Sequence, residues 1–155
     1  MLEIVREILV AAPPADVWPL VDDPARYGQW LAFADDAEVL EGRGLGRLQR
    51  MYGHAGKRKT QIDQVVTEYR ARRKLTWEYR SELLDGKPAP VYARTTELSI
   101  QLDPDGEFTL VRLRWRQEPA TAMRGRMLKW FAAPEVGKAM KKSLDRLQAM
   151  VGGGP

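Results

Sequence analysis

The chain has 155 residues, of which 44% are hydrophobic and 30% are charged, and it contains no cysteine. This length fits one domain with a real core, and the composition argues against disorder. The lack of cysteine excludes disulfides, thiolate catalysis and cysteine-based metal sites. Charges interrupt the N-terminus where a signal peptide needs an apolar run, and no stretch approaches the roughly 20 apolar residues of a membrane span. We therefore expect a cytoplasmic protein.

The formal net charge of +4 is unevenly distributed along the chain. Residues 1–42 hold nine acids and two bases, a net of −7, and the remainder holds 12 acids and 23 bases, a net of +11. Such a basic portion could attract an anionic partner. No aromatic-plus-basic repeat and no recognition-helix pattern accompanies the charge, so nucleic acid is an unlikely partner by this criterion.

The first third of the chain predicts one strand and two short helices. Leu2 to Val10 alternates charged and aliphatic residues, which predicts a strand that ends before Pro13. Pro14 and Asp16 favour a helix start, because proline tolerates the first turn and an acid favours the positive end of the helix dipole. A second short helix follows and offers four residues for burial: Tyr27, Trp30, Leu31 and Phe33.

About six antiparallel strands are expected next, over residues 37–40, 47–52, 60–69, 75–82, 92–102 and 109–116. The clearest alternation places Leu75, Trp77 and Tyr79 on one face of a strand. Asp105-Gly106 supplies the positive backbone angles of a tight hairpin. The Gly-x-Gly-x-Gly stretch at 42–46 lacks the helix start of a phosphate loop, which favours a glycine-rich turn.

The last region, 119–151, predicts a long helix interrupted at Pro134. Its apolar residues recur at spacings of three and four and predict one buried face: Met123, Met127, Trp130, Phe131, Met140, Leu144, Leu147 and Val151. Because the elements upstream are mostly strands, we expect a curved antiparallel sheet that wraps this helix. The predicted fold is α+β, as one ligand-binding domain over residues 1–151, with 152–155 as a flexible tail.

Several segments together form a family-like pattern: Ala12-Pro13-Pro14-Ala15-Asp16-Val17-Trp18, Val21-Asp22-Asp23, Tyr27, Trp30, Gly44-Leu45-Gly46, Leu75-Thr76-Trp77 and Ser143-Leu144-Asp145-Arg146-Leu147. With these residues the whole chain resembles the START-like (SRPBCC) superfamily, which has the birch-pollen-allergen-like helix-grip fold. It is most similar to the bacterial polyketide cyclase/dehydrase-type members. The resemblance implies an apolar cavity between the sheet and the C-terminal helix that binds a lipid, a polyketide or a similar molecule. The superfamily spans carriers, receptors, cyclases and chaperone co-activators, so the resemblance leaves the function open.

Aromatic residues and unbranched methionines can line a cavity for ligands of imprecise shape, although any single methionine is more readily explained as core. The predicted cavity residues are Trp30, Phe33, Trp77, Tyr79, Tyr92, Arg94, Thr96, Met123, Met127, Phe131 and Met140. Among them, Arg94 lies between Tyr92 and Thr96 in an alternating strand. A buried arginine needs an acid or an anionic ligand, so we hypothesise that Arg94 anchors the polar end of an apolar ligand. The alternative is an Arg94 at the rim, which reaches water over an apolar stem.

Little else in the sequence indicates catalysis. His54 is the only histidine and lies in a glycine-flanked turn, and no nucleophile elbow or triad spacing is present. With one histidine and no cysteine we expect neither a metal nor a cofactor. Arg50 and Gln64 share strand parity with apolar residues, and we expect Arg50 at the rim.

Three functions stay open on this basis. The first is a carrier or sensor that binds a hydrophobic small molecule, one with an anionic end if Arg94 acts as the anchor. The second is a polyketide cyclase or dehydratase, in which a cavity folds the substrate and a few polar groups handle protons. The third is a regulatory module that contacts a protein or membrane complex. Inward acid–base residues are scarce, which argues against an enzyme, and the oligomeric state has no sequence signal.

Overall fold

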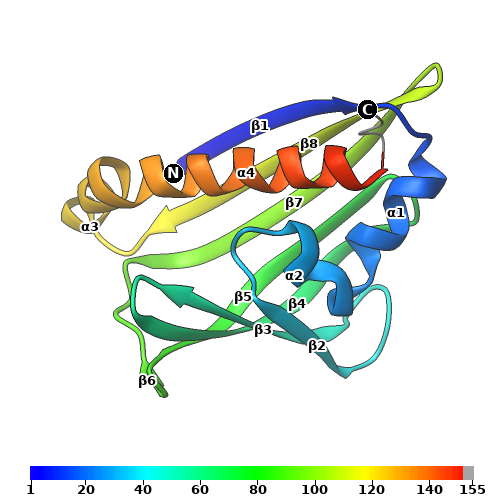
Figure 1. The fold of residues 1–155 in the computed structure, drawn as a ribbon. Coiled ribbons are helices and arrows are strands. Elements are labelled where there is room, and N and C mark those ends of the chain that lie inside the picture. The colour runs from blue at the N-terminus through cyan, green and yellow to red at the C-terminus, as the bar shows by residue number, and fades with distance from the viewer. Residues whose placement is uncertain (152–155) are drawn as a thin grey trace.

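The computed structural model describes residues 1–151 (Figure 1), so the expected tail at 152–155 lies outside the described residues. The chain begins with β1 (Leu2–Val10), α1 (Pro14–Asp22), the 3-10 turn η1 (Pro24–Arg26) and α2 (Tyr27–Trp30). The strands that follow are β2 (Asp36–Glu41), β3 (Leu48–Ala55), β4 (Arg58–Arg70), β5 (Lys74–Leu84), β6 (Lys87–Pro88), β7 (Ala93–Asp105) and β8 (Phe108–Pro119). The chain ends with α3 (Ala122–Met127), the π-helical turn η2 (Leu128–Ala132) and α4 (Ala133–Val151).

All strands belong to one antiparallel sheet in the order β1-β8-β7-β5-β4-β3-β2, with the short β6 paired to β5. The sheet curves around α4, while α1 and α2 cover the other end of its concave face (Figure 1). The predicted α+β helix-grip fold is therefore confirmed. The one added strand is β6, which lies between the strands expected at 75–82 and 92–102.

Alternating residues of the central strands form the core. Val66, Trp77, Leu98 and Trp115 lie opposite one another across β4, β5, β7 and β8, and all are buried. The Tyr27 ring stacks on Trp77 with ring centroids 5.3 Å apart. From the helix side, Met140, Leu144 and Leu147 complete this core. Side chains thus fill the middle of the space between the sheet and α4, where the sequence predicted an apolar cavity.

The prediction of one continuous buried helix face is wrong for residues 122–132. Met123, Met127, Trp130 and Phe131 are 70%, 40%, 72% and 76% exposed, and within this segment only Leu128 is buried. The physical reason is the length of the sheet. The helical region continues past the strands that α4 covers, so α3 projects from the end of the sheet (Figure 1).

Pro134 does not interrupt the helix as predicted. A proline inside a helix removes one backbone hydrogen bond and clashes with the carbonyl of the preceding turn. The chain widens to a π turn immediately before Pro134, where the Ala133 N–H donates to the Leu128 carbonyl. The helical path is therefore continuous from α3 into α4. None of the helices within residues 1–151 has the length and apolarity needed to cross a membrane.

Candidate functional site

An open groove lies where β5 and β7 separate. The two strands pair only between Lys74–Glu78 and Glu97–Gln101. Beyond Glu78, β5 continues beside β4 and β6, whereas β7 stays with β8. The groove between them has a volume of about 630 Å³ and is lined by residues of β3 to β8, the loop at 89–92 and Leu128. This volume lies within the range of small-molecule sites.

A β-bulge in β5 decides which side chains enter the groove. Tyr79 pairs with Gln64 and Ser81 pairs with Asp63, so Arg80 is an extra residue in β5. A bulge shifts the alternation by one position. Tyr79 and Glu82 consequently share a face, as their register partners Gln64 and Ile62 do. Strict alternation would have put Glu82 on the outer face, which is why the sequence did not identify it.

A second bulge in β7 places Arg94 at the rim. Ala93 pairs with Pro119 and Thr95 pairs with Glu118, which leaves Arg94 outside the ladder. Its side chain lines the groove but is 68% exposed, and its Nη1 lies 3.8 Å from the Glu118 carboxylate. Strict alternation would have made Arg94 a buried cation without a partner, but it is exposed and lies near an acid. It is positioned to meet only the outer end of a ligand.

Buried polar groups gather at the inner end of the groove. The Gln117 Nε2 donates to Thr96 Oγ1 at 3.2 Å, and both residues line the groove. Its Oε1 and the indole N–H of Trp115 are buried and have no hydrogen-bond partner within residues 1–151. The Trp115 ring lies between Phe33, stacked at 5.5 Å, and Tyr79, edge-on at 5.7 Å. Of these two unpartnered atoms, the Gln117 oxygen belongs to a residue of the groove lining, so it is the atom to which a ligand in the groove can donate.

Burial raises the pKa values of two ionisable groups in the groove. Burial raises the pKa of the Tyr79 hydroxyl well above its ordinary value, and the nearby Glu82 charge adds to this. Partial desolvation also raises the pKa of the Glu82 carboxyl. Water still reaches Glu82 because the groove is open, but protein atoms replace part of its hydration shell. Tyr79 and Glu82 thus form a pair of oxygen acids beside an apolar surface.

A buried polar network supports the groove from behind. The Arg47 side chain donates to the Asp22 carbonyl at 2.8 Å, to the Asp22 carboxylate at 3.2 Å and to the Tyr27 hydroxyl at 3.3 Å. It also donates to Gln49 at 3.1 Å, and Gln49 in turn donates to Gln64 Oε1 at 2.8 Å. Gln64 is fully buried opposite Tyr79 in the register, and its Nε2 lacks a partner within the described chain.

The predicted cavity residues fall into three groups. Tyr79, Tyr92, Arg94 and Thr96 line the groove. Trp30, Trp77 and Met140 are fully buried in the core, and Phe33 packs behind the groove on Trp115. Met123, Met127 and Phe131 are exposed on α3 and η2. Glu82, Gln117 and Leu128 line the groove without having been predicted.

The remaining candidates lie outside the groove lining. Arg50 faces the outer side of the sheet and forms a two-bond ion pair with Asp63, at 2.7 and 3.0 Å. His54 contacts the Asp35 carboxylate through Nδ1, and both side chains are exposed. In the described part of the chain, no group of three or more potential metal-ligating side chains comes together.

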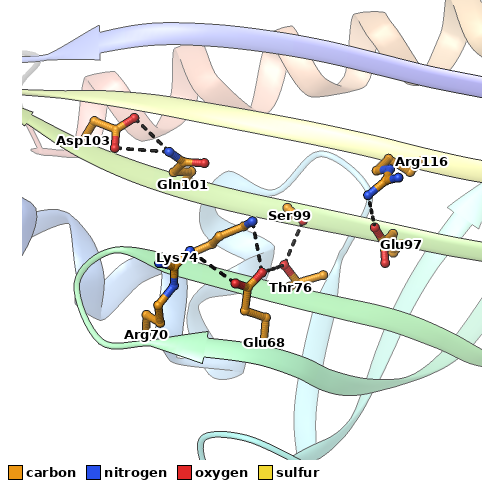
Figure 2. A network of polar contacts seen from close by, with 9 residues as sticks. All are labelled: Glu68, Arg70, Lys74, Thr76, Glu97, Ser99, Gln101, Asp103 and Arg116. Carbon is orange, nitrogen blue, oxygen red and sulfur yellow. Dashed lines mark hydrogen bonds and ion pairs between the residues drawn. The ribbon is translucent and has the colours of Figure 1, made fainter.

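The outer face of the sheet carries a second, polar depression of about 390 Å³ (Figure 2). Here Glu68 pairs with Lys74 at 3.0 Å, Arg116 pairs with Glu97 at 3.2 Å, and the Thr76 and Ser99 hydroxyls are 2.8 Å apart. Acids on neighbouring strands thus neutralise much of the positive charge of this face. Its lining is too polar for an apolar ligand, which favours the groove as the candidate site.

The comparisons with known proteins agree with this architecture. Residues 1–152 match the family described as "Polyketide cyclase / dehydrase and lipid transport". The protein TTHA0849 from Thermus thermophilus has a similar structure, with a TM-score of 0.74, 19% identity, and coverage of 95% of this chain and 94% of that one. A START superfamily protein from Mycobacterium smegmatis gives a TM-score of 0.68 at 14% identity, with 96% of each chain covered.

A third similar structure is DynU16, a protein of the dynemicin biosynthetic locus. It is 18% identical, with a TM-score of 0.66, and the match covers 94% of this chain and 45% of that one. No curated protein sequence matches this chain.

Proposed function

Because the chain belongs to the polyketide cyclase / dehydrase and lipid transport family, we propose that it binds a hydrophobic small molecule in the groove between β5 and β7, as a carrier or sensor. The family supports a hydrophobic ligand or a cyclase substrate, and the groove supplies a place for either. Residues 1–151 form the binding domain in this proposal, and a cytoplasmic location stays a prediction.

The observation that carries the proposal is the combination of an apolar groove with unpartnered buried polar atoms at its inner end. Leu84, Ala93 and Leu128 contribute apolar lining. Gln117 Oε1 can accept a hydrogen bond, and the Tyr79 hydroxyl can donate one. We therefore propose a ligand with an apolar body and an uncharged polar group, such as a hydroxyl or carbonyl, at the inner end.

The proposal is tested by filling the groove. Ala93→Trp places a large side chain in the groove, whereas Thr95→Trp adds the same bulk two residues away on the outer face. Native mass spectrometry of the purified proteins should detect a co-purifying small molecule with the wild type and with Thr95→Trp, but not with Ala93→Trp. Equal retention by both variants would show that the ligand binds elsewhere.

Arg94 has a separate role in this proposal, as a rim contact for an anionic outer end of the ligand. Arg94→Met should weaken binding of a fatty acid about tenfold while leaving binding of the corresponding alcohol unchanged, in line with the strength of charge-assisted hydrogen bonds. An unchanged fatty-acid affinity would remove Arg94 from the site.

A specific observation also favours the cyclase alternative. Glu82 and Tyr79 lie on the same face of β5 in the groove, and burial raises the pKa of Glu82, so its carboxyl takes up a proton more readily than that of a fully hydrated glutamate. In a cyclase they would transfer protons at the carbonyl and adjacent carbon of a folded poly-ketone. Loss of turnover of such a substrate in Glu82→Gln, with binding retained, would support an enzyme. Binding of an unchanged poly-ketone by the wild type would support the carrier.

A further inference from the structure

The segment formed by α3 and η2 exposes several large apolar side chains to water. Met123, Met127, Trp130 and Phe131 are all exposed within one short helical stretch. Val91 and Tyr92, on the loop that leads into β7, are exposed as well. This loop is adjacent, because the Ala120 N–H donates to the Tyr92 carbonyl and the Arg124 guanidinium donates to the Val91 carbonyl. Exposed apolar patches of this kind mark interaction surfaces.

The four side chains share one face of the helical path. Their spacings of four, three and one place them within about 100° of one another on a helix. Leu128 points the other way and is buried against the groove. The segment is therefore amphipathic in an unusual sense, since its exposed side is the more apolar one. Two of the four residues, Trp130 and Phe131, are of the aromatic types found where a protein enters a lipid interface.

The charges of this segment favour an anionic lipid surface as its partner. Residues 119–134 contain three bases, Arg124, Arg126 and Lys129, and no acid. At 100° per residue, Arg124 and Arg126 fall on the two flanks of the exposed apolar face. Cations that flank an apolar face can reach lipid phosphates while their stems lie along the acyl boundary. The guanidinium of Arg124 also lies 5.6 Å from the Tyr92 ring, which joins the loop to the same surface.

We propose that α3, η2 and the loop at 91–92 form a docking surface for an anionic lipid bilayer. Trp130 and Phe131 insert at the level of the headgroups, and Arg124 and Arg126, on the two flanks of the apolar face, contact lipid phosphates. Tyr92, Val91 and Leu128 also line the groove, so docking would place the groove mouth at the membrane surface. This inference concerns a surface rather than the groove ligand, and it stands or fails separately from ligand binding.

Tryptophan fluorescence provides a direct readout, because the chain has five tryptophans and four of them are buried: Trp18, Trp30, Trp77 and Trp115. Vesicles of phosphatidylcholine and phosphatidylglycerol, at roughly three to one, should shift the emission to the blue as Trp130 leaves water. Vesicles of phosphatidylcholine alone should give a much smaller shift. Trp130→Phe should abolish the shift while the protein still floats with the anionic vesicles.

Two double variants separate the apolar and charged contributions. Trp130→Ser with Phe131→Ser should abolish flotation. Arg124→Glu with Arg126→Glu should weaken it about 25-fold or more, since each cation near an anionic surface contributes roughly a factor of five. High salt should weaken wild-type binding in the same direction.

Matched controls lie at the opposite end of the sheet, near the β4–β5 and β7–β8 turns. Leu9→Ser with Phe108→Ser removes two exposed apolar side chains there, and Arg72→Glu with Arg73→Glu reverses two exposed charges. Both controls should float like the wild type. Three results would overturn the proposal. They are no binding of the wild type to anionic vesicles, an equal loss in the controls, and a wild-type dimer that Trp130→Ser with Phe131→Ser converts to a monomer.

Discussion

Removal of the Arg47 guanidinium should destabilise the fold more than any other single charge deletion in the sheet. The Arg47 side chain is 5% exposed and joins three elements, since it bonds to Asp22 at the end of α1, to Tyr27 in α2 and to Gln49 in β3. Arg47→Met keeps much of the apolar stem and deletes only the donors. The Asp22 carbonyl, the Asp22 carboxylate and Gln49 Oε1 each lose a hydrogen bond.

The size of the destabilisation depends on the Asp22 charge, which Arg47→Met leaves without its partner. Deleting one partner of a buried ion pair costs about 3–5 kcal/mol because the other charge is left uncompensated. Asp22 is 33% exposed and keeps a hydrogen bond from the Tyr69 hydroxyl at 3.2 Å, so the lower end of that range applies. We expect a loss of about 3 kcal/mol of unfolding free energy, which for a domain of this size lowers Tm by roughly 6–12 °C.

Urea unfolding followed by tryptophan fluorescence measures this loss directly. Arg50→Met is the matched control, because Arg50 lies three residues further along, on the outer face, and its pair with Asp63 is in contact with water. It should change the midpoint much less. In the Arg47→Met background, Asp22→Asn should recover part of the stability, since it removes the charge that lost its partner. A loss below about 1 kcal/mol in Arg47→Met would refute the buried-network interpretation.

Three further predictions concern the groove and its support. Gly53→Ala should cost about 2–3 kcal/mol in urea unfolding, because the added Cβ would lie 2.6 Å from the Phe33 carbonyl oxygen, a backbone atom that side-chain rotation cannot move. Gln117→Leu should change the unfolding free energy by less than about 1 kcal/mol, because it removes a buried unpartnered carbonyl together with the bond to Thr96 Oγ1, and it should weaken ligand binding about tenfold. The Glu82 carboxyl has a raised pKa in the folded state, so folding takes up a proton between its ordinary value near 4.5 and the raised one. The unfolding free energy should therefore rise as pH falls through that window, and apolar ligands should bind more tightly at its acidic end. Glu82→Gln should flatten the pH profiles of both stability and ligand affinity.

Regular alternation made most of the fold predictable from the sequence. Trp77 and Leu98 could be assigned to the inner face because apolar and polar residues alternate without a break on either side of them, and both are buried as neighbours in the sheet. Alternation fails at Arg80 and Arg94, where one extra residue enters the strand. Neither position carries the glycine that would have signalled a bulge. Glu82 was therefore missed, and the sequence could not decide between an inward and a rim position for Arg94.

Helical periodicity failed for a different reason. Spacings of three and four identify one apolar face, but they carry no information on how far the sheet extends to cover it. Met140 and Leu144 of α4 are buried, whereas Met123 and Met127 are exposed on α3, which projects past the end of the sheet (Figure 1). Nothing in the sequence indicated that Arg47 would be enclosed, because its partners come from elements up to 25 residues away.

Two of the four register shifts in the described sheet lie at the groove, whereas those between Val39 and Glu41 and between Val66 and Glu68 involve no residue of its lining. The bulge at Arg80, the bulge at Arg94 and the π turn before Pro134 all border the groove or the exposed segment beside it. Most of the remaining strand residues, the core and α4 agree with their local sequence preferences. Natural sequences violate such agreement where a site requires it. The groove combines two bulged strands, the unpartnered Gln117 oxygen and apolar lining beside the exposed segment of α3 and η2, and this combination favours it over the polar outer face as the place where the protein meets its ligand.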